Sequence, residues 1–192
     1  MKKKIRIGIL GGTFDPPHLG HIALAREAAR QLELDKVIFI PALLPPHKTV
    51  KDNNPSLRYK MAALACRNNP LFEVSTIELD RNGISYSVDT LRELKKIYGA
   101  STRFFFLTGS DSLKELKTWK ESKKLLKLTH FVVAKRPGFP MRGTKCGMIV
   151  LNAPLLDISS SAIRKRVKNS LPIKQLVPEA VRKFIKDKGL YK

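Results

Sequence analysis

The amino-acid sequence predicts an α/β protein with a doubly wound, mostly parallel sheet and a small C-terminal helical segment. Short aliphatic runs alternate with helical patterns over most of the 192 residues, which is the order expected of parallel strands joined by crossover helices. These runs show little polar alternation, as strands buried on both faces do. We expect a single domain over residues 1–192, with 158–192 as its C-terminal helical part.

The first half of the chain begins with a buried strand at Ile5–Leu10, which is aliphatic apart from Arg6. Residues 18–32 carry their apolar side chains along one side, as an amphipathic helix does. A second aliphatic strand, Lys36–Ala42, leads into a loop rich in proline and polar residues. Ser56 is the expected N-cap of the next helix, whose apolar residues are Leu57, Met61, Leu64 and Ala65.

The second half continues with an expected strand at Phe72–Leu79 and a helix at Ser87–Tyr98, which ends at Gly99 as helices commonly do. Arg103–Gly109 is a strongly apolar strand, and a helix is expected to start at Ser110 and Asp111 and to continue through Leu113, Leu116 and Trp119. The remaining predicted elements are a helix at 121–128, strands at 130–138 and 147–154, and helices at 159–168 and 178–189.

Three polar loops fall at the carboxyl ends of predicted strands, namely Gly11–His21, Leu43–Lys51 and Thr108–Asp111. Right-handed crossovers place such loops on one edge of a parallel sheet, where ligands bind in open α/β proteins. We therefore expect the functional site at this edge.

Composition restricts the partners without naming one. The chain has 37 Lys and Arg against 16 Asp and Glu, a formal charge of +21, which favours anionic ligands. The basic residues are scattered, so much of this charge is equally compatible with a solvated surface. Cys66 and Cys146 form no disulfide framework or metal pattern and are expected to be buried thiols in a reducing compartment. Without a signal peptide or an apolar run long enough to span a bilayer, we expect a cytoplasmic protein with no membrane partner, and a homo-oligomer stays open.

The segment GGTFDPPHLGH, Gly11–His21, has the composition of an anion-binding loop. Its glycines let the backbone turn tightly beside a ligand, its prolines suit a helix's first turn, and a helix N-terminus attracts phosphate. His18 and His21 share one edge of that helix, and Gly20 leaves room beside them. Packing and zinc binding are the alternatives, although no third zinc ligand is nearby, and the loop matches neither a dinucleotide fingerprint nor a P-loop.

The segment ISSSAIR, Ile158–Arg164, offers a second anion site. Its serines supply an N-cap and hydroxyl donors, and Arg164 lies one turn beyond Ser160 and Ser161. The alternative is an ordinary capped basic helix.

Together these two segments resemble the signature motifs of the HxGH nucleotidylyltransferases, relatives of the class I aminoacyl-tRNA synthetases, with Ser161 in place of a threonine. Further matches resemble the bacterial nicotinate mononucleotide adenylyltransferases within that superfamily: LPPHK at 44–48, ISYSVDT at 84–90, TGSDSL at 108–113 and KRPG at 135–138. The match extends from Ile7 to Gly189–Tyr191. It implies a Rossmann-like nucleotidylyltransferase fold and transfer of the adenylyl group of ATP to nicotinate mononucleotide, giving deamido-NAD and pyrophosphate for NAD biosynthesis.

The resemblance also implies residue roles. His18, His21 and Arg164 would be catalytic. ATP would contact Gly11, Gly12, Thr13, Phe14, Gly109, Asp111, Ile158, Ser160 and Ser161. The mononucleotide would contact His47, Lys48, Tyr86, Ser87, Trp119 and Arg136. Mg²⁺ is expected on the triphosphate rather than in a dedicated protein site, and Asp15 would either reach that metal or cap its own loop.

Two rival functions follow from the same sequence. A sister enzyme on this fold, such as pantetheine-phosphate adenylyltransferase or a cytidylyltransferase, is disfavoured by PPHK, SYSVDT and KRPG. A non-catalytic nucleic-acid-binding domain would explain the basic charge but not the two intact motifs, so a nucleic-acid partner is not expected.

Overall fold

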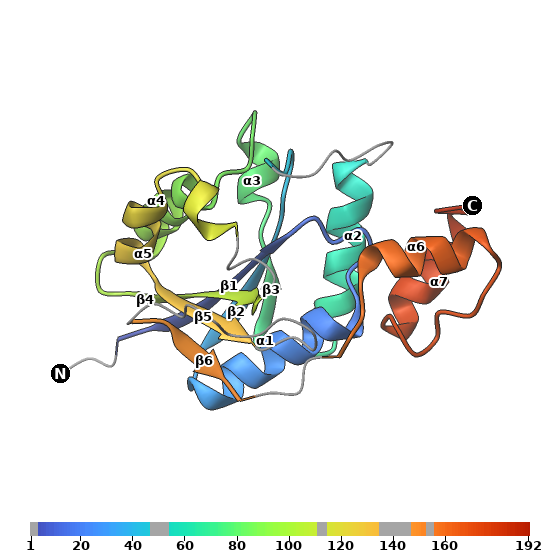
Figure 1. Cartoon of the computed structure of the whole chain (residues 1–192), viewed down its shortest axis with the longest axis horizontal. Coiled ribbons are helices and arrows are strands. Elements are labelled where there is room, and N and C mark those ends of the chain that lie inside the picture. The colour runs from blue at the N-terminus through green and yellow to red at the C-terminus, as the bar shows by residue number, and fades with distance from the viewer. Residues whose placement is uncertain (1–3, 47–53, 111–114, 135–146, 153–155) are drawn as a thin grey trace.

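The computed structural model describes residues 4–46, 54–110, 115–134, 147–152 and 156–192 and has a parallel sheet with helices on both faces (Figure 1). The sheet has six strands in the order β3-β2-β1-β4-β5-β6, and each neighbouring pair is parallel. The chain order reverses between β1 and β4, which makes the sheet doubly wound, as predicted. The strands are β1 Arg6–Gly12, β2 Lys36–Pro41, β3 Phe72–Val74, β4 Arg103–Gly109, β5 His130–Ala134 and β6 Ile149–Leu151.

Helices cover the two faces of the sheet in separate layers. Their bounds are α1 Leu19–Gln31, α2 Pro55–Cys66, α3 Ile77–Asp80, α4 Ser87–Tyr98, the 3₁₀ helix η2 Leu116–Thr118, α5 Ser122–Leu128, α6 Ser160–Lys168 and α7 Glu179–Asp187. Alternate residues of β4 show the division. Phe105 and Leu107 pack with α1 on one face, whereas Phe104 and Phe106 pack with α4 and α5 on the other.

The C-terminal helices α6 and α7 lie at one end of the molecule, beside α2 (Figure 1). Their apolar side chains form a third cluster, in which Ile163, Val181 and Ile185 surround Met61 of α2. The predicted C-terminal helical segment is therefore attached to the α/β body through α2, and it is placed near the end of β1 where Gly11–His21 begins.

Several local predictions need correction. The expected strand at 72–79 stops at Val74, and residues 77–80 form α3 instead, because Thr76 accepts backbone hydrogen bonds from Leu79 and Asp80. The N-cap of α2 is Asn54, whose Oδ1 accepts from the Ser56 backbone N–H at 2.9 Å. Helix α1 begins at Leu19, so the proline pair precedes the helix.

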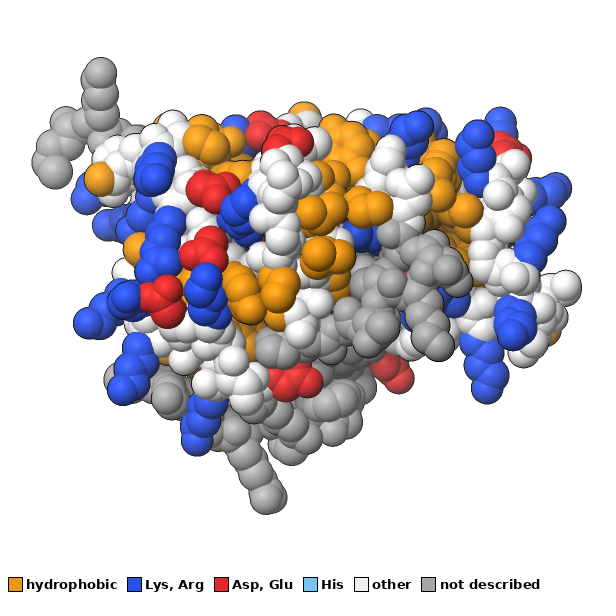
Figure 2. All heavy atoms as spheres, turned by 90° about the horizontal axis from the view of Figure 1, so that it is seen from above, with side chains coloured by type: hydrophobic (Ala, Val, Ile, Leu, Met, Phe, Trp, Pro, Cys, Tyr) orange, Lys and Arg blue, Asp and Glu red, His pale blue; other side chains and the backbone are white. Residues whose placement is uncertain are grey.

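Cysteine burial and surface charge can be followed in the described residues. Cys66 is buried, and burial raises the pKa of its thiol to about 12; Cys146 lies outside the described residues. Within those residues, no helix has both the length and the apolar character needed to cross a membrane. Figure 2 shows lysine and arginine side chains around the margin of one face, with hydrophobic side chains gathered between them. The basic charge of that face is dispersed, so it does not by itself mark a site.

Candidate active site

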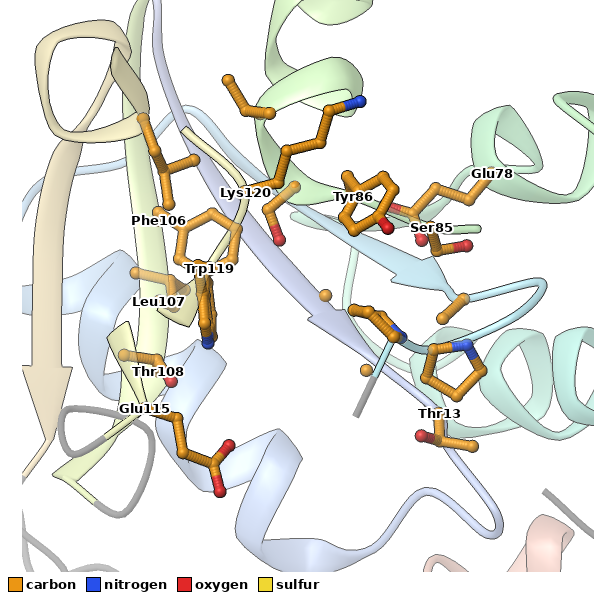
Figure 3. A pocket seen from close by; sticks show the side chains of 18 residues that line it. Thr13, Glu78, Ser85, Tyr86, Phe106, Leu107, Thr108, Glu115, Trp119 and Lys120 are labelled. Carbon is orange, nitrogen blue, oxygen red and sulfur yellow. The ribbon is translucent and has the colours of Figure 1, made fainter. Parts of the chain in front are cut away.

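A pocket opens at the carboxyl ends of β1 and β4, as the topology predicts. It contains six of the predicted site residues: Gly11 and Gly12 at the end of β1, Thr13 directly after it, Tyr86 and Ser87 at the start of α4, and Trp119 after η2. Its other lining residues are Ala42, Pro45, Pro46, Glu78, Ser85, Val88, Phe106, Leu107, Thr108, Glu115, Lys120 and Leu125. Trp119 and Tyr86 lie on opposite sides of the opening (Figure 3).

The two aromatic side chains are held by different contacts. The Trp119 ring packs edge-on against Phe106 at 5.8 Å and Phe131 at 6.3 Å between ring centroids. Its indole N–H is buried and has no hydrogen-bond acceptor among the residues that the structure describes. Lys120 lies 4.5 Å from the Tyr86 ring centroid and pairs with Asp89 at 2.9 Å. The pocket therefore offers a fixed aromatic wall and an indole donor to a flat ligand.

The two histidines lie beyond the pocket residues of the same loop. His18 is the N-cap of α1, and its backbone N–H donates to Nδ1 of His21 at 3.2 Å. The two rings stack with centroids 3.7 Å apart. Because Nδ1 of His21 accepts this bond, its ring proton lies on Nε2, which makes Nε2 the donor of that side chain. A Cβ at Gly20 would lie 3.0 Å from Nδ1 of His18, so the glycine leaves room for that ring.

Helix α6 approaches this loop from the far end of the sequence. Ser159 is its N-cap and accepts from the Ala162 N–H at 3.2 Å. Ser160 Oγ donates to the Pro16 carbonyl at 2.9 Å, and Arg164 Nη1 donates to the Asp15 carbonyl at 2.7 Å. These bonds bring the N-termini of α1 and α6 to the same loop, and two helix N-termini are favourable surroundings for an anion.

Asp15 is engaged by protein groups on both of its carboxylate oxygens. Tyr191 donates to Oδ1 at 2.5 Å, and Arg164 lies 3.5 Å from Oδ2. Across the described part of the chain, no group of three His, Cys, Asp or Glu residues is arranged to hold a metal ion. Of the two roles expected for Asp15, these contacts favour anchoring of its loop over metal binding.

Arg58 of α2 connects the loops that follow β1 and β2. It is fully buried and donates to the carbonyl oxygens of Thr13 at 3.0 Å, Ala42 at 2.5 Å and Leu43 at 3.0 Å. Burial lowers the pKa of its guanidinium, and the nearby Asp15 carboxylate opposes that shift. The arginine thus fixes two edges of the pocket relative to each other.

The other predicted residues divide into those that are placed and those that are not described. Gly109 ends β4 next to the pocket residue Thr108, and Phe14 is buried with its ring edge-on to His21 at 5.1 Å. Ile158 packs against the third core cluster, and Ser161 lies 3.2 Å from Ser159 through their hydroxyl oxygens. Asp111, His47, Lys48 and Arg136 lie outside the described residues.

Four further residues of this region carry no role in the sequence interpretation, namely Arg58, Glu78, Lys120 and Tyr191. Arg58 and Tyr191 lie within matched segments, yet nothing local indicates that their side chains reach the loop after β1. Glu78 was expected in a strand, so its position in α3 was not foreseen. Lys120 is one of many lysines, and nothing in the sequence distinguishes it from the others. Only the tertiary contacts distinguish them.

Glu78 is a buried carboxyl group in the pocket wall. Its side chain accepts from Thr90 Oγ1 at 2.5 Å, and Arg81 donates to the same hydroxyl at 3.0 Å. Burial raises its pKa above the ordinary value of 4.5. Protonation of Glu78 therefore stabilises the folded state. This contribution to the free energy of unfolding is fully present below about pH 4.5 and is lost as the pH rises through the raised pKa.

Replacing Glu78 by glutamine should make stability less dependent on pH. Glutamine keeps an acceptor for Thr90 but does not titrate, so the free energy of unfolding of Glu78→Gln relative to wild type should increase as the pH rises above about 4.5. Urea titrations from pH 4.5 upward measure this difference. Glu33→Gln, at an exposed position, is the control for the substitution itself; a flat difference for Glu78→Gln would contradict the buried-carboxyl assignment.

The fold and this site define a doubly wound α/β protein with an aromatic pocket at the carboxyl ends of its strands and two helix N-termini at the loop after β1. The cytidylyltransferase-like family model matches residues 9–166. A curated relative from Thermoanaerobacter sp. (strain X514), named "Probable nicotinate-nucleotide adenylyltransferase", is 45% identical over 206 residues, covering 100% of this chain and 97% of its own. A relative of the same name from Thermus thermophilus is 42% identical, covering 98% of this chain and 100% of its own.

Solved structures agree in fold. A Plasmodium falciparum nicotinic acid mononucleotide adenylyltransferase complexed with NaAD has a TM-score of 0.83 at 21% identity, with 97% of each chain covered. The same enzyme complexed with APC gives a TM-score of 0.80 at 20% identity, again with 97% of each chain covered. The chain belongs to the cytidylyltransferase-like family and, within it, to the family of its nicotinate-nucleotide adenylyltransferase relatives.

Proposed function

We propose that this protein transfers the adenylyl group of ATP to nicotinate mononucleotide, giving deamido-NAD and pyrophosphate. One observation carries the proposal. The end of β1 and the next residue, Gly11–Thr13, line an aromatic pocket, and the N-termini of α1 and α6 meet at the segment that follows, Asp15–His21. ATP bound along this segment would have its β- and γ-phosphates at the helix N-termini. Its α-phosphate, which reacts, would then lie beside the pocket. The names of the curated relatives support the same substrates.

The phosphates of ATP would bind on the side of the histidines. His18 and His21 approach from α1, and Ser160, Ser161 and Arg164 from α6. Helix dipoles, hydroxyl donors and the guanidinium of Arg164, whose side chain is 40% exposed, would together stabilise the negative charge that develops on the leaving pyrophosphate. Gly11 and Gly12 would let the backbone approach the α-phosphate, with Thr13 and Phe14 continuing the contact. Gly109, Asp111 and Ile158 would border the rest of the nucleotide.

The nicotinate ring would bind between Trp119 and Tyr86. Both rings face the pocket, and the indole N–H offers a donor to the ligand. Ser87 and the first N–H groups of α4 are suited to the ring carboxylate, because a helix N-terminus attracts an anion. His47, Lys48 and Arg136 are proposed as cations for the mononucleotide phosphate.

The chemistry requires alignment and charge neutralisation rather than a covalent protein intermediate. An oxygen of the mononucleotide phosphate attacks the α-phosphorus of ATP in line, the new P–O bond forms, and the bond to pyrophosphate breaks. Two anions must approach closely, so cations and N–H groups around both are the main contribution of this chain. We propose that Mg²⁺ enters as the Mg²⁺–ATP substrate, since the carboxylate of Asp15 is already bound by Tyr191 and Arg164.

A substrate panel tests the proposal. The purified protein is incubated with Mg²⁺–ATP and, separately, nicotinate mononucleotide, nicotinamide mononucleotide or phosphopantetheine; a CTP reaction with choline phosphate covers the cytidylyltransferase alternative. Pyrophosphate release is measured and the product identified by mass. We expect the highest kcat/KM with nicotinate mononucleotide and a deamido-NAD product. Turnover confined to phosphopantetheine or CTP would refute the assignment.

Substitution of Trp119 should affect one substrate selectively. We expect Trp119→Ala to raise KM for the mononucleotide by about tenfold, the size of one lost ring-stacking interaction, and to change KM for ATP much less. Trp119→Phe keeps a ring without the indole N–H and separates stacking from hydrogen bonding. Steady-state kinetics with each substrate varied in turn measures both constants. Equal increases in the two constants would contradict the stacking role.

We also infer that the protein works in the cytoplasm without a membrane or nucleic-acid partner, where both proposed substrates are available. Its dispersed basic charge would then serve small anions and solubility rather than a polyanion. Tight, salt-sensitive binding of DNA or RNA by a protein that lacks adenylyltransferase activity would favour the nucleic-acid alternative instead.

A further inference from the structure

Tyr191 reaches the loop after β1 from the end of α7. Helix α7 is followed by a Schellman motif, in which Leu190 N–H donates to the Ile185 carbonyl at 3.0 Å and Gly189 N–H to the Lys186 carbonyl at 3.1 Å. Gly189 has φ of 60°, the left-handed conformation that this motif requires at that position. The motif turns the chain back over α7, so that Tyr191 packs in the cluster of α2, α6 and α7.

The Tyr191 hydroxyl ends beside Asp15, 176 residues away in the sequence. It donates to Oδ1 of Asp15 at 2.5 Å and lies 3.8 Å from the sulfur of Met61 in α2. Tyr191 itself has φ of 65°, a conformation that costs a non-glycine residue about 1 kcal/mol or more. Burial raises the pKa of the phenol, so the hydroxyl keeps its proton and acts as a donor to the carboxylate.

Asp15 is the point at which this contact meets the candidate active site. Its Oδ2 and its main-chain carbonyl both contact Arg164, at 3.5 Å and 2.7 Å. With Oδ1 held by Tyr191, the carboxylate has one orientation, and the Arg164 guanidinium is fixed from one side. Most of its N–H groups then remain for a ligand. The residues that follow Asp15 lead directly to His18, so the same contact also fixes the entry to α1.

We propose that Tyr191 is a positioning residue for the phosphate site, acting through Asp15 on Arg164 and on the Asp15–His18 segment. This role rests on the proposed adenylyl transfer and adds a residue to it. Tyr191 touches no substrate. Its hydroxyl fixes the geometry in which the triphosphate is bound. It therefore affects ATP more than the mononucleotide, because neither Asp15 nor Arg164 lines the aromatic pocket.

The test removes one oxygen atom. Tyr191→Phe should raise KM for ATP by about tenfold, as expected for a lost hydrogen bond to a charged group, while KM for the mononucleotide changes less than about twofold. Tyr98→Phe is the matched control: its phenol contacts a charged side chain, Lys36, but at the amino ends of the strands, and it should leave both constants unchanged. In an Asp15→Ala background, Tyr191→Phe should have no further effect on KM for ATP.

A second measurement does not depend on activity. Hydrogen–deuterium exchange of the ligand-free protein should become faster in the peptide covering residues 11–21 of Tyr191→Phe, and not in that of Tyr98→Phe. A lower Tm with unchanged exchange in this peptide and unchanged KM for ATP would overturn the proposal, as would equal rises in both Michaelis constants. An inactive wild-type protein would instead refute the adenylyl transfer, and the exchange result would then decide whether Tyr191 positions the loop.

Discussion

His18→Ala and His21→Ala should each lower kcat by at least about a hundredfold, the effect expected when a donor to developing negative charge is removed. Both rings lie at the N-terminus of α1, stacked at 3.7 Å, where the helix dipole adds to their attraction for phosphate. Turnover of Mg²⁺–ATP and nicotinate mononucleotide, read as pyrophosphate release, measures the effect. Thermal unfolding of each variant should remain cooperative, which shows that the fold survives.

The hydrogen bond within the histidine pair allows a sharper comparison at His21. Its Nδ1 accepts from the His18 backbone N–H, so any hydrogen bond that this neutral ring donates comes from Nε2. The amide nitrogen of glutamine can occupy a position near Nε2, whereas that of asparagine lies near Nδ1. His21→Gln should therefore retain more activity than His21→Asn. Near wild-type turnover in both alanine variants would refute the phosphate role of the pair, and the reverse order of the amide variants would refute the Nε2 assignment.

Arg58→Met should lower the free energy of unfolding by about 3 kcal/mol or more, because three carbonyl oxygens in the two loops lose a buried donor. In a domain of this size, that corresponds to a fall in Tm of roughly 6–12 °C. Methionine fills similar space without the charge, so the loss reports the hydrogen bonds rather than a cavity. Calorimetry or urea titration provides the measurement.

Two control variants define that result. Arg58→Lys keeps the charge, but a single ammonium group cannot reach all three carbonyl oxygens as the planar guanidinium does. The free energy of unfolding of Arg58→Lys should therefore lie between those of Arg58→Met and wild type. Arg67→Met, at an exposed position of the neighbouring turn, should change stability by less than about 0.5 kcal/mol. If Arg58→Met were as stable as Arg67→Met, the hydrogen bonds from Arg58 to the two loops would contribute nothing to the free energy of unfolding.

Local patterns were sufficient for most of the sheet. The aliphatic runs at Lys36–Pro41 and Arg103–Gly109 and the glycine after Tyr98 correspond to β2, β4 and the end of α4. The prediction was wrong where a short apolar run could form either one long strand or a short strand followed by a helix. Residues 72–79 look continuous in sequence, yet the strand at the edge of the sheet pairs only through Val74, and the chain then turns into α3.

The candidate site was predicted in two separate halves. The residue types of Gly11–His21 indicated an anion-binding loop, and those of Ile158–Arg164 indicated a capped helix with donors. No spacing argument could join them, because the contacts from Ser160 to Pro16 and from Arg164 to Asp15 span 144 and 149 residues. Only the resemblance to a family indicated that the two segments form one site. In the structure they meet because α6 packs in the same apolar cluster as α2.

The sequence by itself determined the alternation of strands and helices, the edge of the sheet at which the candidate site lies, and the presence there of residue types suited to phosphate. These properties depend on neighbours within a few turns of the chain, through apolar periodicity, turn chemistry and helix capping. Only the tertiary structure decided which distant side chains hold the loop after β1. Arg58 and Tyr191 are ordinary in their local sequence and acquire their roles because α2 and the turn after α7 pack against that loop, where buried carbonyl and carboxylate oxygens require donors.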